Sequence, residues 1–263
     1  MALYENQFDA AHHYAETNTT KTLVIASTVR SGSHMLGHAL HTTGAFGFPL
    51  EYVQKQNLAQ WKKQFGVSSL EEVMAKLQRC RTSPNGVFGI KVHYSHLNQT
   101  CGGFDTLLEL LPNPYFVLLT REDVMAQAVS LSVARQTGSW ISGQGNKQAE
   151  PVYNFDEIDN GLRRILFENA SWRYTLAASG CRYMELNFND VKSSMKTTVK
   201  RIADFAGIEL DENSIPDAPV TKKQSKTLND QWMKMFRSEF SADTELMRYN
   251  QESLPRRLYR RFF

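Results

Sequence analysis

The stretch Thr22-Leu-Val-Ile-Ala-Ser-Thr-Val-Arg-Ser-Gly-Ser-His34 joins an apolar run to a turn of small residues. Its first half, residues 22–27, predicts a strand that is buried on both faces. A short helix is predicted to follow over residues 33–43. In an α/β fold such a loop lies outside the carboxyl end of a strand and at the start of a helix. Free backbone amides and the helix dipole favour negatively charged oxygens there, so the stretch predicts an anion-binding loop.

The side chains of this loop agree with anion binding. Ser31 and Ser33 supply hydroxyl donors, and Arg30 brings a fixed positive charge. Gly32 allows the backbone to approach a ligand closely. A serine-rich turn that only caps a helix is the alternative interpretation. The Walker A pattern GxxxxGK[ST] is absent and no lysine precedes Ser33, which argues against hydrolysis of ATP or GTP.

Outward from this loop, strand and helix patterns alternate along the chain. Such alternation predicts an α/β fold, with a mostly parallel central sheet and helices on both faces. Further strands are expected at residues 86–92, 115–120 and 182–186, and helices at residues 70–81, 104–111, 123–137, 155–178 and 190–206.

Length and composition predict one domain. The chain has 263 residues, of which 41% are hydrophobic and 11% aromatic, enough for one large core. We therefore expect residues 1–263 to form a single domain. Within it, residues 1–20 read as a polar N-terminal extension and residues 251–263 as a basic, aromatic tail.

Charge and cysteine content exclude several classes of protein. The net charge of +3 gives no support for a partner made of nucleic acid. The cysteines Cys80, Cys101 and Cys181 are odd in number and lack a CxxC pair, which argues against a disulfide framework and a zinc site. The first 20 residues contain no apolar signal segment. No run approaches the ~18 apolar residues of a membrane span, so we expect a cytoplasmic protein.

Several blocks of sequence resemble a known family. Over roughly residues 22–240 the chain is similar to the trehalose 2-sulfotransferase family of bacterial enzymes, which use 3′-phosphoadenosine 5′-phosphosulfate (PAPS) as donor. That family reads Arg-Ser-Gly-Ser-Thr in the loop, so His34 departs from its pattern. The other matching blocks are Thr43-Gly44, Gly47-Phe-Pro-Leu-Glu-Tyr52, Gly86-Val-Phe-Gly-Ile-Lys91, Leu119-Thr-Arg-Glu-Asp-Val-Met-Ala-Gln-Ala-Val-Ser130, Gln136-Thr-Gly138 with Trp140, and Tyr153-Asn-Phe-Asp-Glu-Ile158.

The resemblance implies a P-loop-like sulfotransferase fold and a donor site without a metal ion. The phosphosulfate is expected in the loop after the first strand. The 3′-phosphate, which distinguishes PAPS from ordinary nucleotides, is expected at an arginine after a later strand and a serine on the next helix. A C-terminal basic loop is implied to close over the same phosphate. The residues implied to bind the donor are Arg30, Ser31, Gly32, Ser33, His34, Arg121, Ser130, Lys222, Lys223 and Gln224.

The acceptor side follows from the same resemblance. Glu51 has the position of the family's general base, although a helix cap or an ion pair with a surface arginine is the alternative for a glutamate in such a turn. Arg30 and His34 are expected beside it in the catalytic centre. The residues expected to bind the acceptor are Glu51, Tyr52, Lys91, His93 and Trp140, and Lys91 is also expected to stabilise charge on the transferred group. His93 and Trp140 are included for their positions after the second strand and at the head of the loop over residues 139–151. The alternatives are a core or surface role for His93 and a buried anchoring role for Trp140.

Three histidines share one face of the predicted first helix. His34, His38 and His41 are spaced by four and three residues, a spacing that can hold a metal ion. We expect an exposed polar stripe instead.

The resemblance implies a sulfotransferase that acts on a hydroxyl or an amine of a small polar acceptor. A sugar, a glycolipid head group and a secondary metabolite all fit, and a homodimer is also implied. A catalytically silent nucleotide-binding protein and a P-loop nucleotide kinase are the alternatives. The missing Walker lysine disfavours the kinase. The joint presence of Arg30, Glu51, Arg121 and Ser130 disfavours a loss of catalysis.

Overall fold

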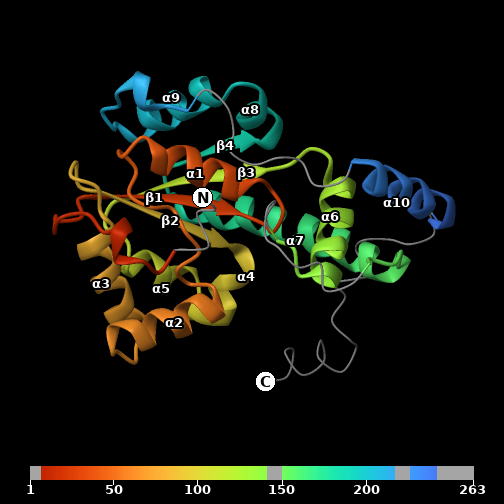
Figure 1. Ribbon diagram of the computed structural model, residues 1–263, viewed down its shortest axis with the longest axis horizontal. Coiled ribbons are helices and arrows are strands. Elements are labelled where there is room, and N and C mark those ends of the chain that lie inside the picture. Colours follow the sequence, from red (N-terminus) through yellow and green to blue (C-terminus); the bar gives the residue numbers. More distant parts are fainter. Residues whose placement is uncertain (1–6, 141–149, 217–225, 242–263) are drawn as a thin grey trace.

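Four parallel strands form the central sheet of the part of the chain that the structure describes (Figure 1). The structure is a computed structural model that describes residues 7–140, 150–216 and 226–241. Strand β1 (Lys21–Ser27) lies between β2 (Val87–His93) and β3 (Pro114–Thr120), and β4 (Tyr183–Asn187) completes the order β2-β1-β3-β4. Every pairing is parallel, so the carboxyl ends of these strands meet at one edge of the sheet.

Helices cover both faces of the sheet because β1 is apolar on both sides. Leu23 and Ile25 pack into one core cluster, whereas Val24 and Ala26 pack into another. The predicted α/β fold is therefore confirmed. One layer contains α1 (Ser33–Thr42), α8 (Phe188–Ser193) and α9 (Met195–Ala206), and the other contains α2 (Lys55–Phe65), α3 (Leu70–Arg81), α5 (Phe104–Glu109) and α7 (Phe155–Ser179).

The strand order reverses at the carboxyl end of β1, and the region outside that end is here called the crevice. The chain runs from β1 to β2 on one side, while β3 pairs with β1 on the other side. In open α/β sheets, ligands bind outside the carboxyl ends of the strands where the order reverses in this way. Ser27 at the end of β1 pairs with Leu119 near the end of β3. The loop after β1 and Arg121 after β3 therefore lie at the same edge.

A third core cluster holds the last described helix in place. Trp232 and Phe236 from α10 (Lys226–Glu239) pack against Leu131 of α6 (Val124–Thr137) and Ile158 of α7. Figure 1 shows these helices grouped beside the sheet. Since Ser130 precedes Leu131 on α6, this cluster also anchors one wall of the crevice.

Two elements differ from the sequence-based prediction. The helix α2 was not predicted, although Gln54 caps it and the buried residues Leu58 and Trp61 lie one turn apart. The helix expected over residues 190–206 is divided into α8 and α9, because Ser194 between them is non-helical, with φ −143° and ψ 57°. Shorter helical turns are η1 (Ala10–His12), α4 (Tyr94–His96), the π-helical η2 (Leu97–Cys101) and η3 (Glu212–Ser214).

The ends of the chain are described in part. Residues 7–20 of the polar extension are described, whereas the tail at residues 251–263 lies outside the described residues. Cys80, Cys101 and Cys181 are free thiols. Among the described helices, none combines the length and apolar character needed to cross a bilayer. A single domain over residues 1–263 stays a prediction.

Candidate active site

The loop after β1 has an uncommon backbone conformation. Arg30 has φ 62° and Gly32 has φ 90°, both in the left-handed region. A Cβ atom at Gly32 would lie 2.1 Å from Cδ2 of Phe188, so only glycine fits at this position. Strain at a non-glycine residue such as Arg30 is typical of functional sites.

Ser31 and Ser33 are buried in this loop. Ser31 is 0% exposed, and its hydroxyl has no hydrogen-bond partner among the described residues. A buried polar group without a partner is destabilising. A ligand oxygen at the start of α1 would supply the missing partner, so the Ser31 hydroxyl fits an anion-binding site.

Arg30 links the loop to α6. Its Nε donates to Oγ of Ser130 at 2.9 Å, and its Nη1 donates to the carbonyl of Trp140. Burial, together with the charge of Arg121, lowers the pKa of Arg30 to about 10. Burial also lowers the pKa of Arg121, and Asp123 partly offsets that shift. The guanidinium groups of Arg30 and Arg121 are thus close enough to repel each other, and a bound anion would reduce that repulsion.

Side chains from α6 and α7 fix the start of the loop. Nε2 of Gln127 donates to Oγ1 of Thr28 at 2.9 Å and to the carbonyl of Val29 at 2.7 Å. The Thr28 hydroxyl donates to Oδ1 of Asn169 at 3.4 Å. Gln127 and Asn169 were not among the predicted site residues, because no local pattern distinguishes them from other polar residues on a helix.

Glu51 forms an ion pair with Lys91, which lies near the carboxyl end of β2. Its Oε1 atom is 2.7 Å from Nζ of Lys91 and 3.2 Å from Nε2 of His93. The Glu51 side chain is 19% exposed, whereas that of Lys91 is 2% exposed. Burial alone would raise the pKa of Glu51, but Lys91 and His93 outweigh it and hold the pKa well below its usual value. Glu51 is therefore an ionised carboxylate that still reaches the surface.

His93 ties this ion pair to the carboxyl end of β1. Its Nδ1 lies 3.1 Å from Oγ of Ser27, the last residue of β1. Its backbone N–H donates to Nδ1 of His96 at 3.2 Å. The side chain of Glu51 is thus fixed by residues at the carboxyl ends of β1 and β2.

The expectation of an exposed histidine stripe on α1 is wrong. His38 is 6% exposed, and its ring lies 4.7 Å from that of His34. Burial, aided by the charge of Lys91 and by His38, lowers the pKa of His34 to about 2. Burial and His41 lower the pKa of His38 to about 4. These imidazoles are neutral at physiological pH, and His34 is near enough to Lys91, Glu51 and Arg30 to feel their charges.

The remaining predicted site residues divide into three groups. Tyr52 lies in the core at 1% exposure, and its hydroxyl donates to the carbonyl of Phe48, so the structure removes it from the acceptor surface. Trp140 is 44% exposed next to Arg30. Lys222, Lys223 and Gln224 lie outside the described residues. Within the described ranges, no cluster of three or more His, Cys, Asp or Glu side chains is arranged to hold a metal ion.

Phe188 is a site residue that the sequence did not reveal. It begins α8, and its ring fills the space beside Gly32. The guanidinium of Arg121 lies over the same ring, 5.3 Å from its centroid. One aromatic side chain therefore touches both candidate anion subsites. Its position after β4, the strand next to β3, is the only signal for it in the sequence.

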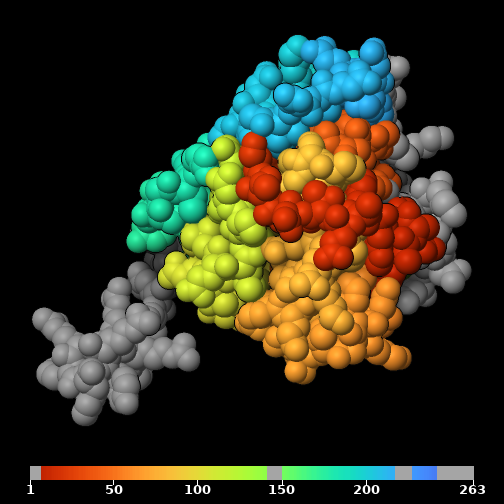
Figure 2. All heavy atoms as spheres, turned by 90° about the vertical axis from the view of Figure 1, so that its left-hand side faces the viewer, coloured from red at the N-terminus to blue at the C-terminus, as the bar shows by residue number. Residues whose placement is uncertain are grey.

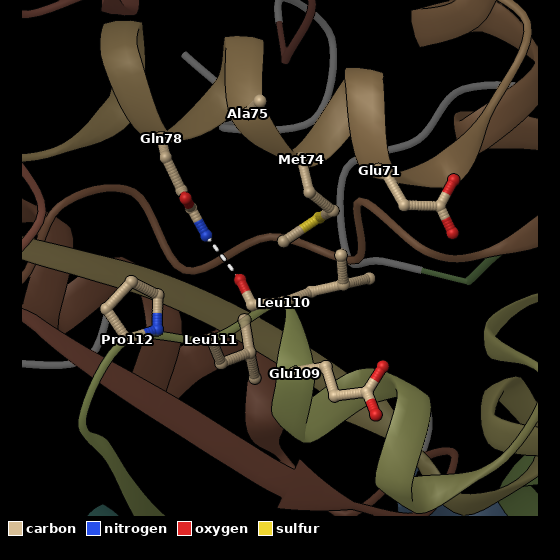
Figure 3. A pocket seen from close by; sticks show the side chains of 8 residues that line it. All are labelled: Glu71, Met74, Ala75, Gln78, Glu109, Leu110, Leu111 and Pro112. Carbon is tan, nitrogen blue, oxygen red and sulfur yellow. Dashed lines mark hydrogen bonds between the residues drawn. The ribbon is translucent and has the colours of Figure 1, made fainter.

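A separate pocket of about 300 Å³ lies between α3 and the segment after α5 (Figure 3). Gln78 spans it by donating to the carbonyl of Leu110 at 2.7 Å. None of the candidate site residues lines this pocket. The lining residues are Glu71, Met74, Ala75, Gln78, Glu109, Leu110, Leu111 and Pro112.

Comparison with known proteins identifies the family of this chain. The model of the Stf0 sulphotransferase family matches residues 22–239. The trehalose 2-sulfotransferase of Mycobacterium tuberculosis is 24% identical, covering 85% of this chain and 97% of the relative, and that of Mycolicibacterium smegmatis is 22% identical with the same coverage. One similar solved structure is the sulfotransferase domain of the Synechococcus PCC 7002 olefin synthase, with a TM-score of 0.44 and 16% identity over 89% of this chain and 92% of that domain. Another is the mouse sulfotransferase SULT7A1 complexed with PAP, with a TM-score of 0.43 and 12% identity over 92% of this chain and 73% of that one. The chain belongs to the Stf0 sulphotransferase family and is a sulfotransferase.

Proposed function

We propose that this enzyme transfers the sulfuryl group of PAPS to a hydroxyl group of a sugar or another small polar acceptor. The observation that carries the proposal is the 2.9 Å hydrogen bond between Arg30 and Ser130, which brings the loop after β1 together with the Arg121 side of the crevice. PAPS has two separate anionic groups, and this arrangement offers two cationic subsites. The two curated relatives are both trehalose 2-sulfotransferases, which favours a sugar hydroxyl over an amine.

The donor is assigned to the two subsites by their chemistry. The phosphosulfate fits the loop, where the Ser31 hydroxyl lacks a partner among the described residues and Arg30 carries a positive charge. The 3′-phosphate fits Arg121, and the Ser130 hydroxyl, which accepts from Arg30, is its proposed second ligand. Lys222, Lys223 and Gln224 remain proposed donor ligands on the strength of the sequence resemblance.

The acceptor is assigned to the crevice beside Glu51. In the proposed reaction the acceptor oxygen forms a bond to sulfur while the bond from sulfur to the phosphate oxygen of the donor breaks. The acceptor proton passes to Oε1 or Oε2 of Glu51, and the product 3′-phosphoadenosine 5′-phosphate (PAP) leaves. As in phosphoryl transfer, the main demands on the protein are alignment and stabilisation of charge on the equatorial oxygens. Arg30 and Lys91 supply positive charge, and the neutral imidazole of His34 is near enough to both to feel their charges.

The low pKa of Glu51 suits this reaction. A carboxylate held ionised by Lys91 is ready to accept a proton at neutral pH, although it is a weak base. Weak basicity is sufficient if cleavage of the bond to the leaving group runs ahead of proton loss, as in a loose transition state.

The pH dependence of turnover follows from this ionisation. Because the pKa of Glu51 is lowered, its deprotonated form predominates above that pKa and is lost only as the pH falls through it. We expect kcat/KM for the acceptor, measured at saturating donor, to show no decrease as the pH is lowered from about 8 to about 6. An acid limb within this range would contradict the assignment of Glu51 as the base, because its pKa is held well below the range.

Phe188→Leu is expected to weaken binding of PAP more than binding of adenosine 5′-phosphate (AMP), which lacks the 3′-phosphate. The change removes the ring beneath Arg121. A cation–π contact contributes about 0.5–2 kcal/mol, so the Kd for PAP should rise about 2- to 30-fold. Phe188→Tyr keeps the aromatic face and is the matched control. Calorimetric titration with both nucleotides checks the prediction, and equal loss for PAP and AMP would show that Phe188 supports the loop rather than Arg121.

The function is tested first on the wild-type protein. Titration with PAP and with AMP should show micromolar binding that requires the 3′-phosphate. Incubation with PAPS and a panel of sugars beginning with trehalose should then yield a sulfated sugar and PAP in equal amounts. Equal binding of both nucleotides, or binding of neither, would overturn the proposed donor. Donor binding without any sulfated product would favour the catalytically silent alternative.

Two further properties belong to the same proposal. The three free thiols fit a reducing compartment, which supports a cytoplasmic location. The family resemblance supports a homodimer, and sedimentation of the full chain with and without PAP tests it.

A further inference from the structure

The N-terminal arm, residues 7–20, lies outside the stretch that the family model matches, which begins at residue 22. It is nevertheless packed against the domain. Figure 2 shows it as a red band that crosses the orange surface of the α2 and α3 region. The arm contacts the Glu51 turn, defined here as residues 46–53, by three routes.

The first route passes through Arg81 at the end of α3. Arg81 is 0% exposed, and its Nη2 donates to the carbonyls of Gln7 at 2.9 Å and Asp9 at 3.1 Å. Its guanidinium lies 4.9 Å from the ring centroid of Phe48 and 5.4 Å from that of Trp61. Two carbonyls of the arm therefore hold a buried cation against a core residue of the Glu51 turn.

The second route is direct contact with the turn. The ring of His12 lies 4.8 Å from the ring of Phe48, which is stacked on His41 at 3.9 Å on another side. The hydroxyl of Tyr14 donates to the carbonyl of Gly47 at 3.4 Å, and Nδ1 of His41 lies 3.1 Å from the same carbonyl. The arm and α1 thus fix the start of the turn together.

The third route reaches the backbone of Glu51 itself. Nε2 of Gln7 donates to Oδ1 of Asn57 at 3.4 Å, and Nδ2 of Asn57 donates to the carbonyl of Glu51 at 3.0 Å. The amide of Asn57 therefore connects the arm to the residue that carries the proposed base.

The opposite side of the turn is held by tight backbone contacts. A Cβ atom at Gly37 of α1 would lie 2.9 Å from the Pro49 carbonyl, and one at Gly89 of β2 would lie 2.2 Å from the Phe46 carbonyl. The carbonyl of Leu50 accepts from the amide of Lys91 at 2.9 Å. The turn is confined between α1 and β2, and the arm closes the side that they leave.

We infer that the N-terminal arm is a positioning element that sets the place of Glu51 relative to the acceptor. This inference rests on the proposed function. Among the described residues, no hydrogen bond, ion pair or ring contact joins residues 7–20 to Ser31, Arg121 or Ser130, which are proposed to bind the donor. Loss of an arm contact should therefore slow the chemical step and leave donor binding intact.

His12→Ala tests the inference because it removes the ring that packs on Phe48. A shift of the base by a fraction of an ångström is costly in rate, so kcat for transfer from PAPS to trehalose should fall about 10-fold. The Kd for PAP should stay within about twofold of the wild-type value. His12→Phe restores a ring and should restore kcat. Glu16→Gln is the control, since its ion pair with Arg79 is exposed and lies elsewhere on the arm.

Hydrogen–deuterium exchange provides a readout that does not depend on activity. In His12→Ala, residues 46–53 should exchange faster, while residues 28–36 of the donor loop should not change. Arg81→Met is a second variant with the same expected pattern. Unchanged kcat together with unchanged exchange in His12→Ala would overturn the inference, as would an equal loss of kcat and PAP affinity. If wild-type protein sulfates neither trehalose nor any other sugar of the panel, the sugar acceptor of the proposed function is wrong, and the exchange data alone decide whether the arm holds the turn.

Discussion

Glu51→Gln is expected to lower kcat for sulfuryl transfer by about 10²- to 10⁴-fold, the usual contribution of a general base. Glutamine keeps the shape of the side chain but cannot accept the acceptor's proton. The Kd for PAP should change by less than about twofold, because Glu51 contacts Lys91 and His93 rather than the residues proposed for the donor. Steady-state kinetics with PAPS and trehalose, with parallel PAP titrations, checks both parts.

The same substitution leaves Lys91 as a buried cation without its carboxylate. Removing one partner of a buried ion pair typically costs about 3–5 kcal/mol, so Glu51→Gln should also be less stable. The double variant Glu51→Gln with Lys91→Met removes both charges, and most of the lost stability should return. Its kcat should stay low. This comparison separates loss of the base from loss of stability, and full activity in Glu51→Gln would show that Glu51 is not the base.

The parallel sheet and its helices could be predicted from sequence because their patterns are local. The run Leu23 to Ala26 is apolar throughout, which indicates burial on both faces before any partner strand is known. The helix α2 was not predicted because its apolar face consists of Leu58, Trp61 and Phe65 in an otherwise largely polar segment. The break between α8 and α9 at Ser194 was not predicted because serine occurs both at helix caps and within helices.

The candidate site was predictable as a list of residues but not as an arrangement. Glu51, Lys91 and His93 were each expected near the acceptor, yet their union at one carboxylate oxygen depends on the pairing of Leu50 with Ile90, two segments 40 positions apart. Tyr52 was wrongly placed there because the chain turns after Glu51 and sends the next side chain into the core, where it stacks on Phe88. Such long-range packing leaves no local signal in the sequence.

Arg121→Ala is expected to raise the Kd for PAP about 100-fold and to leave the Kd for AMP nearly unchanged. The loss of one charged partner from a partly buried contact costs about 2–5 kcal/mol, and 1.4 kcal/mol corresponds to a factor of ten. AMP lacks the 3′-phosphate, so it cannot report that contact. The ratio of the two dissociation constants therefore isolates the 3′-phosphate from the rest of the nucleotide.

Arg30→Ala is the matched comparison, because Arg30 is the second guanidinium of the crevice but is assigned to the phosphosulfate. It should weaken PAP and AMP by similar factors, since both carry a 5′-phosphate at the loop after β1. A selective loss of PAP in Arg121→Ala with an equal loss in Arg30→Ala would assign the two ends of the donor. A selective loss of PAP in both variants would mean that the Arg30–Ser130 pair belongs to the 3′-phosphate subsite. Equal losses of PAP and AMP in Arg121→Ala would contradict the proposed 3′-phosphate subsite, because the charge of Arg121 would then serve the nucleotide as a whole.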